Sequence, residues 1–179
     1  MADFNFVFKK IIANEGVYGN DPADKGGETC FGISRKFNPD WEGWARVDAK
    51  KINGRPQGLT ADKELEKMVF DFYKANFWNK ISGDAFASNE VACSIADFAV
   101  NVGVPRAARI VQSVVGTVMD GRIGNKTIQA IESMQERTFL DLFCEAKGDY
   151  YRLITKNRPR NEKFLNGWLN RAERMRFIN

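Results

Sequence analysis

The chain has 179 residues, of which 44% are hydrophobic, 28% are charged and none is histidine. This composition predicts a soluble globular protein with one core, or with a core that carries a second lobe. Without histidine, Ser-His-Asp and Cys-His catalysis are excluded and the usual zinc and iron sites are disfavoured. The three cysteines, Cys30, Cys93 and Cys144, lack a metal-binding spacing and are expected to be reduced and mostly buried. We therefore predict no metal and no other cofactor.

The two halves of the chain differ in charge. Residues 1–105 carry 13 lysines and arginines against 15 acidic residues, whereas residues 106–179 carry 14 against 8. The basic second half suits a polyanionic partner, such as nucleic acid, a membrane surface or an acidic cell-wall polymer. A basic surface that contacts only solvent explains the excess equally well.

Membrane and export signals are not evident. No apolar run approaches the roughly 18 residues of a membrane span, and the opening residues lack the basic region and unbroken apolar core of a signal peptide. We therefore expect that the protein does not insert stably into a membrane and that it is synthesised in the cytoplasm. Action outside that compartment would then need a separate release route.

The first predicted element is a helix of about three turns that begins near Asp3, a candidate N-cap. Its apolar residues recur at helical spacing: Phe4, Val7, Phe8, Ile11 and Ile12. Continuing this spacing leads to Glu15, so a carboxyl group stands at the C-terminal end of the apolar face, and Gly16 is the predicted stop. Residues 16–33, which contain Pro22 and the pair Gly26-Gly27, are predicted to form a loop or a small hairpin.

Further helices follow along the chain. A short helix is predicted around residues 40–47, then a polar connector over residues 50–58, and then an amphipathic helix capped by Thr60. Ser88 and Gly103 bound a buried central helix. The last predicted helices run from Pro105 to about Gly116, from Asn125, from about Thr138 to Lys156, and from about Glu162 to the end. Because no strand pattern appears outside the opening loop, the sequence predicts a mainly α fold of about seven or eight helices.

Glu15 is a candidate general acid. A carboxyl group at the edge of an apolar face loses water around its ionised form, so it keeps its proton nearer neutral pH. Glycoside cleavage needs such an acid, together with a second group that acts as nucleophile or positions a water. Asp24 and Thr29, nine and fourteen residues further on, could supply that group from the loop. Alternatively, Glu15 pairs with a lysine or faces solvent, Asp24 makes an Asx turn and Thr29 bonds to the loop backbone.

Motifs across the chain point to one family. The opening segment contains Glu15-Gly16-Val17-Tyr18, Asp21-Pro22, Asp24, Gly26-Gly27, Thr29 and Gly32-Ile33. It resembles the signature of glycoside hydrolase family 108, which reads Glu-Gly-Gly-Tyr, Asn-Asp-Pro-x-Asp, Gly-Gly-x-Thr and Gly-Ile-Thr. The resemblance continues in Tyr73, Phe77-Trp78, Asp97-Phe98-Ala99-Val100-Asn101-Val102-Gly103, Asp120-Gly121-x-x-Gly124-x-x-Thr127 and Gly167-Trp168-Leu169-x-Arg171. Two positions depart from the pattern, because Val17 replaces the second glycine and Ser34 the final threonine.

This resemblance implies a lysozyme-like α fold and peptidoglycan hydrolysis. The family includes phage and prophage endolysins and proteins once labelled secretion activators. By the resemblance, Glu15 matches the catalytic acid. The layout of Glu15, Asp24 and Thr29 is also similar to that of phage-type lysozymes, which implies that Asp24 and Thr29 order the attacking water.

Four further residues are candidate substrate contacts. Tyr18 would line the sugar cleft, where an aromatic ring can stack on a pyranose, and Trp78 has a matching family position near that cleft. Asp97 and Asn101 share a face of the predicted central helix and would hold the cleft or contact sugar. Buried polar pairs more often satisfy loop backbone groups, and tryptophans more often belong to the core, so these alternatives stay open.

The second half resembles a peptidoglycan-binding lobe. Asp120-Gly121-Arg122-Ile123-Gly124 is similar to the Asp-Gly-x-x-Gly turn of helical wall-binding modules, although a tight connection between helices produces the same pattern. We therefore predict a catalytic segment over residues 1–92 and a helical peptidoglycan-binding segment over residues 93–179, packed on it as one compact unit.

Together these features predict an N-acetylmuramidase that cleaves the β-1,4 bond between N-acetylmuramic acid and N-acetylglucosamine. Its expected partner is the glycan strand of peptidoglycan, reached in the cell wall or periplasm after release by a holin-type partner, and the protein is expected to be a monomer. The main alternative is a wall-binding or secretion-assisting protein whose catalytic site has decayed, as Val17 could indicate. A helical nucleic-acid binder ranks last, because no groove-reading motif is evident, and we predict no nucleic-acid partner.

Overall fold

The computed structural model of the protein describes residues 1–20 and 27–176. Among these residues it contains eight α-helices and five strands of two residues each, which confirms the mainly α prediction. Contacts between residues divide the chain into two compact units. Unit 1 comprises Met1–Val7 and Asn76–Asn179, and unit 2 comprises Phe8–Ala75. This division differs from the predicted one, whose boundary at residues 92/93 falls inside helix α4 (Asn89–Val102).

Helix α1 (Phe4–Ile12) begins in unit 1 and ends in unit 2. The Asp3 carboxylate accepts a hydrogen bond of 2.9 Å from the backbone N–H of Asn5, as expected for an N-cap residue. The helix ends at Ile12, before the predicted stop at Gly16. One further turn follows, in which the N–H of Glu15 donates to the Ile12 carbonyl at 3.1 Å.

A small three-stranded antiparallel sheet follows α1 in unit 2. Its strands are β1 (Tyr18–Gly19), β2 (Thr29–Cys30) and β3 (Ile33–Ser34), in the order β1-β2-β3. Tyr18 pairs with Cys30 in the first ladder, and Cys30 pairs with Ile33 in the second. The sheet matches the predicted hairpin after the first helix. Cys30 and Ile33 are both buried and anchor it to the core of the unit.

The segment predicted as a polar connector forms a second hairpin instead. After α2 (Gly43–Ala49), strand β4 (Lys51–Ile52) pairs with β5 (Arg55–Pro56). Asn53 and Gly54 form the turn with φ of 51° and 79°, the left-handed conformation of both residues that a type I′ hairpin turn requires. The prediction of no strand outside the opening loop was wrong here. Asn-Gly is the signal that could have revealed this turn.

Helix α3 (Lys63–Tyr73) completes unit 2. Its N-cap is Asp62, whose carboxylate accepts from the N–H of Leu65 at 3.0 Å, and the predicted cap Thr60 lies in the preceding 3-10 turn, Leu59–Ala61. Hydrogen bonds from Arg46 and from the Leu65 N–H lower the pKa of the buried Asp62 carboxyl. The cap was misplaced because an aspartate with a cationic partner is the stronger acceptor.

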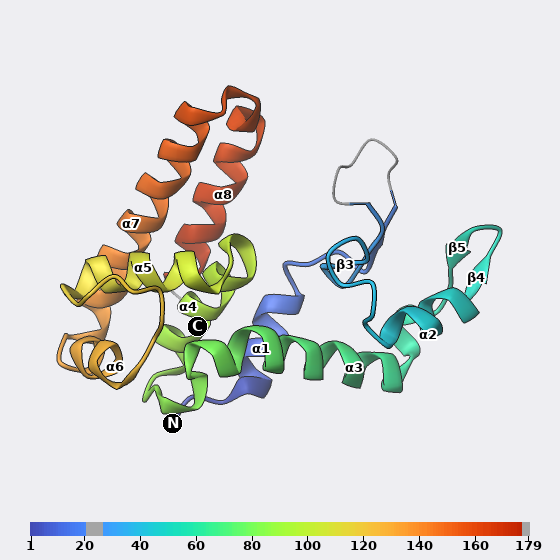
Figure 1. The fold of residues 1–179 in the computed structure, drawn as a ribbon, viewed down its shortest axis with the longest axis horizontal. Coiled ribbons are helices and arrows are strands. Elements are labelled where there is room, and N and C mark those ends of the chain that lie inside the picture. Colours follow the sequence, from blue (N-terminus) through green and yellow to red (C-terminus); the bar gives the residue numbers. More distant parts are fainter. Residues whose placement is uncertain (21–26, 177–179) are drawn as a thin grey trace. The chain divides into compact units, whose positions relative to one another are not determined.

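The other helices belong to unit 1. They are α4, α5 (Val104–Val115), α6 (Asn125–Glu132), α7 (Glu136–Asn157) and α8 (Glu162–Arg174), close to the predicted ranges. Ser88 caps α4 by accepting from the Val91 N–H at 3.2 Å, and residues 91–99 are all buried. Helix α4 packs against α5 and α7, and α7 lies along α8 (Figure 1). The core of this unit therefore forms around α4.

A buried lysine joins α7 to α4. Lys147 is 2% exposed, donates to the Ser94 hydroxyl at 3.0 Å and lies 4.8 Å from the centre of the Phe143 ring. Burial lowers the pKa of Lys147 to about 8.

The three cysteines are buried thiols, as predicted. Within the described residues, every helix is too short or too polar to cross a membrane.

Candidate active site

Glu15 lies in the turn after α1, half-buried, with its carboxyl group against the backbone of Gly32. A Cβ atom on Gly32 would stand 2.7 Å from Oε2 of Glu15 and 2.6 Å from the hydroxyl oxygen of Tyr73. Gly32 has a φ of 76°, which also favours glycine. The structure thus brings the predicted acid together with two residues that the sequence did not assign to the site, Gly32 and Tyr73.

The turn facing Glu15 is a two-residue connection between β2 and β3. Phe31 and Gly32 both have positive φ, 46° and 76°, as in a type I′ turn. The Tyr73 hydroxyl donates to the Phe31 carbonyl at 2.9 Å, and Tyr73 itself is 2% exposed on α3. A non-glycine residue in the left-handed region costs energy, so the surrounding structure must hold Phe31 in this conformation. Three elements therefore fix the backbone beside Glu15: the end of α1, this turn and α3.

Thr29 and Tyr18 lie on neighbouring strands of the same sheet. A Cβ atom on Gly19, which pairs with Thr29, would stand 3.1 Å from the Thr29 hydroxyl oxygen. Tyr18 and Gly19 line a hollow of about 650 Å³, bounded also by residues 54–57 of the second hairpin. Asp24, the third predicted catalytic residue, lies outside the described residues.

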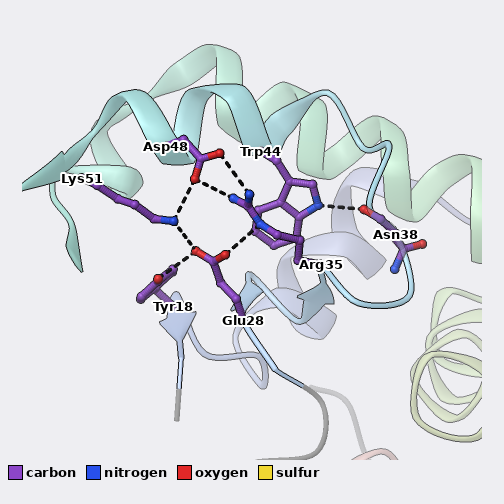
Figure 2. A network of polar contacts seen from close by, with 7 residues as sticks. All are labelled: Tyr18, Glu28, Arg35, Asn38, Trp44, Asp48 and Lys51. Atoms are coloured by element: carbon purple, nitrogen blue, oxygen red, sulfur yellow. Dashed lines mark hydrogen bonds and ion pairs between the residues drawn. The ribbon is translucent and has the colours of Figure 1, made fainter. Parts of the chain in front are cut away.

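Glu28 is the centre of an ionic network that the sequence did not predict (Figure 2). Its carboxylate accepts from the Tyr18 hydroxyl at 2.8 Å and pairs with Lys51 at 2.8 Å and with Arg35 at 2.7 Å. Asp48 of α2 pairs with the same two cations, with Arg35 at 2.7 Å and with Lys51 at 2.8 Å. The guanidinium of Arg35 also lies 4.4 Å from the Trp44 ring centre. The network joins the sheet to α2 and β4.

The charges and hydrogen bonds of this network make Glu28 unsuited to act as an acid catalyst. Partial burial acts to raise the pKa of Glu28, but hydrogen bonds from Lys51 and Tyr18 and the charge of Arg35 outweigh it, and the pKa is lowered. Burial, followed by the hydrogen bond to Glu28, raises the pKa of Tyr18. Glu28 is therefore an ionised structural anion near neutral pH and Tyr18 a neutral phenol.

Trp78 does not occupy a sugar-binding position. Its side chain is 0% exposed in unit 1, packs against Phe4 with 5.2 Å between ring centres, and covers Gly83. The indole N–H donates to Asp84 at 2.8 Å. The prediction of a sugar contact is corrected by this burial, because no face of the ring is left for stacking.

Asp97 and Asn101 lie on α4, in unit 1, and bond to the last two helices. Asp97 is 4% exposed and accepts hydrogen bonds from Arg171 of α8 at 2.8 and 3.0 Å. The Asn101 side chain, on an exposed residue, accepts from the Tyr151 hydroxyl of α7 at 3.0 Å. Asp97 therefore ties two helices together, and its predicted sugar contact would require that pair to break.

The Asp120-Gly121 turn is held by one buried side chain. Gln112 of α5 is 1% exposed, accepts from the Gly121 N–H at 3.0 Å and donates to Asp120 at 2.7 Å and to the Arg122 carbonyl at 2.9 Å. Gly121 has a φ of 81°. The turn is thus a tight connection between α5 and α6.

Comparison with known proteins identifies the class. The family model of glycosyl hydrolase 108 matches residues 8–103, more than half of the chain, and a model described as "Predicted Peptidoglycan domain" matches residues 106–173. The chain therefore belongs to glycosyl hydrolase family 108. The solved structure of SagA from Brucella abortus is similar over 97% of this chain and 91% of its own, with 28% identity and a TM-score of 0.71. A comparison with curated proteins found no match.

The protein is accordingly a glycoside hydrolase of the peptidoglycan-hydrolase type, with a peptidoglycan domain as its second segment. The lysozyme-like, mainly α fold expected from the sequence is confirmed. The two family segments meet between residues 103 and 106, at the junction of α4 and α5. Peptidoglycan is its substrate or partner.

Proposed function

We propose that the protein is a lysozyme-type N-acetylmuramidase in which Glu15 is the general acid. The observation that carries the proposal is the placement of the Glu15 carboxyl against the Phe31-Gly32 turn, which α3 braces through Tyr73. The turn limits where the carboxyl can point, and a fixed donor position is what proton transfer to a leaving oxygen needs. Membership of family 108 supports the reaction class.

In the proposed reaction, Glu15 protonates the glycosidic oxygen as the bond from that oxygen to the muramic acid C1 breaks. A water then attacks C1 from the opposite side and loses one proton to the solvent, from which Glu15 regains its own, and the sugar is released with a new reducing end. Thr29 and Asp24 are proposed to order that water, which would favour inversion at C1. The part given to Asp24 rests on the resemblance to phage-type lysozymes, whereas Thr29 lies on the sheet whose turn faces Glu15.

The alternative of a decayed site rests on Val17. Outside glycine, positive φ occurs among the described residues only at Phe31, Asn53 and Ser82, so Val17 has an ordinary backbone conformation. Its side chain is 41% exposed, and its carbonyl accepts from the Phe31 N–H at 2.9 Å. Valine is therefore accommodated without backbone strain, and this hydrogen bond holds the turn beside Glu15.

The first test is the substitution Glu15→Gln, which keeps the shape of the side chain and removes the acid. We expect normal folding and at least about a 100-fold loss of the rate at which a peptidoglycan suspension clears, the usual contribution of a general acid. Glu42→Gln makes the same change at an exposed position and should leave the rate unchanged. Full lytic activity of Glu15→Gln would remove the proposed role.

The bond that is cut can be read from the products. Mass spectrometry of digested sacculi, after reduction of the new ends, should show N-acetylmuramic acid as the reducing sugar. N-acetylglucosamine at that end would mean that the other glycosidic bond is cleaved. Sedimentation with sacculi without new reducing ends would favour the wall-binding alternative.

We also propose that the protein is made in the cytoplasm and acts in the cell wall or periplasm after release by a holin-type partner. The support is the location of peptidoglycan outside the inner membrane. Cell fractionation before and after membrane permeabilisation tests this route. Export of the protein from cells with an intact membrane and no release partner would contradict it.

A further inference from the structure

The hollow beside β1 is built from two chain segments. Residues 18–20, on β1 and just after it, form one wall, and residues 54–57 of the β4–β5 hairpin form the other. Its volume of about 650 Å³ is that of a small-molecule site. Tyr18 belongs to the sheet whose β2–β3 turn faces Glu15, so the hollow and the proposed acid share one scaffold within unit 2.

The two walls are connected by the Glu28 network (Figure 2). The Tyr18 hydroxyl, from the first wall, donates to Glu28, which also pairs with Lys51 of β4, the strand that leads into the second wall. Asp48 holds the same Lys51 at 2.8 Å. The position of Tyr18 relative to the second hairpin is therefore set before a ligand binds, and a preformed site binds with less ordering cost.

The side chains that line the hollow suit a particular ligand chemistry. Tyr18 offers an aromatic ring for a pyranose, and the amides of Asn20 and Gln57 can bond to hydroxyl and N-acetyl groups. Arg55 adds a guanidinium, which recognises carboxylates with paired hydrogen bonds. Within residues 1–20 and 27–176, no carboxylate forms an ion pair with Arg55, and the residue is exposed.

We propose that this hollow binds an N-acylated sugar that bears a carboxylate, with Arg55 as the anion contact. In peptidoglycan this chemistry belongs to muramic acid and its stem peptide, and not to N-acetylglucosamine. The inference deepens the proposed function, on which it rests, by assigning the carboxylate-bearing part of the substrate to the second hairpin. Arg55 thereby distinguishes peptidoglycan from an uncharged polymer such as chitin.

Binding to the full chain carrying Glu15→Gln tests the proposal without requiring turnover. The probes are N-acetylmuramoyl-L-alanyl-D-isoglutamine, which carries a carboxylate, and N,N′-diacetylchitobiose, which does not, with affinities measured by titration and NMR. We expect Arg55→Ala to weaken binding of the muramoyl probe about fivefold or more and to leave the chitobiose affinity unchanged. Arg55→Lys should retain part of the affinity, because it keeps the charge and loses the paired donors.

Arg160→Ala, which removes an exposed arginine of unit 1, is the matched control and should change neither affinity. Equal muramoyl affinity with and without Arg55 would overturn the proposal, and so would an equal loss for both probes. NMR shift changes at residues 18–20 and 54–57 should accompany binding of the muramoyl probe, and changes confined elsewhere would also overturn it. Since binding and lysis are measured separately, failure of the muramidase proposal is distinguishable from failure of this one.

Discussion

Gly32 shows how tightly a single residue restricts the proposed site. Any side chain there would meet two functional groups at once, the Glu15 carboxyl and the Tyr73 hydroxyl, both within 2.7 Å of the Cβ position. Such contacts are too short to persist, so one or both groups would have to move. Because Tyr73 is buried and bonded to Phe31, the more exposed Glu15 is the group that gives way.

We therefore expect Gly32→Ala to lower lytic activity at least about tenfold, since a displacement of about 1 Å can cost considerably more. Gly58→Ala is the matched control, because Gly58 also has positive φ, 61°, but its Cβ would have nothing within 4 Å. Both substitutions should reduce the free energy of unfolding by about 1–2 kcal/mol through backbone strain. Lysis assays together with urea unfolding separate the two effects. Equal activity of both variants would contradict the placement of Glu15.

The roles of individual residues were only partly predictable from the sequence. Glu15 is predicted to be the acid from its position at the end of an apolar face and from the family motif, and this role stays a prediction. Glu28 was missed because its partners Lys51 and Asp48 come from other elements, and no spacing along the chain signals such a meeting. Trp78 was assigned to the cleft by its position in a motif, yet its burial depends on Phe4, which lies 74 positions earlier in the sequence.

At the scale of elements, the Arg35–Asp48–Lys51 contacts attach α2 to both hairpins. Hydrogen bonds from Arg35 and then Lys51 lower the pKa of Asp48 to about 2, from an ordinary value of 3.8. A carboxyl whose pKa is lower in the folded than in the unfolded state stabilises the fold fully above the unfolded value. That contribution is lost as the pH falls from about 4 to about 2.

Asp48→Asn should therefore reduce the decrease in the free energy of unfolding that occurs as the pH falls. Between pH 5 and pH 2, the free energy of unfolding should fall less in the variant than in the unsubstituted protein, by up to about 1 kcal/mol. The difference is small because Asp48 is half exposed and solvent screens the pair. Asp40→Asn makes the same change at an exposed position and should keep the original pH dependence. Urea unfolding at both pH values measures this, and identical slopes for all three proteins would rule out the network as a stabilising element.

At the scale of the whole molecule, one ion pair joins the two family segments inside unit 1. Asp97 belongs to the glycosyl hydrolase segment and Arg171 to the peptidoglycan domain, and both side chains are largely buried, with 5% and 14% exposed. Removing one member of such a pair leaves a buried charge without its main partner. The pair therefore couples the stability of α4 to that of α8.

Arg171→Ala should lower the free energy of unfolding by about 3–5 kcal/mol. The double variant Asp97→Leu with Arg171→Met replaces both charges by apolar groups and should be clearly less destabilised than Arg171→Ala. Arg152→Ala breaks an exposed pair with Asp149 and should change stability by less than about 1 kcal/mol. Chemical unfolding followed by circular dichroism gives all three values. A loss for Arg171→Ala no larger than that for Arg152→Ala would show that the pair does not hold the helices together.

The sequence by itself determined the number and order of the helices, because caps such as Ser88 and apolar periodicity act over a few neighbouring residues. It also determined the family, since the motifs are contiguous. Only the tertiary structure decided that Glu15 meets Gly32 and Tyr73 and that Asp97 pairs with Arg171. These contacts join residues 17 to 74 positions apart, and which distant groups meet depends on packing of the whole core rather than on any local pattern.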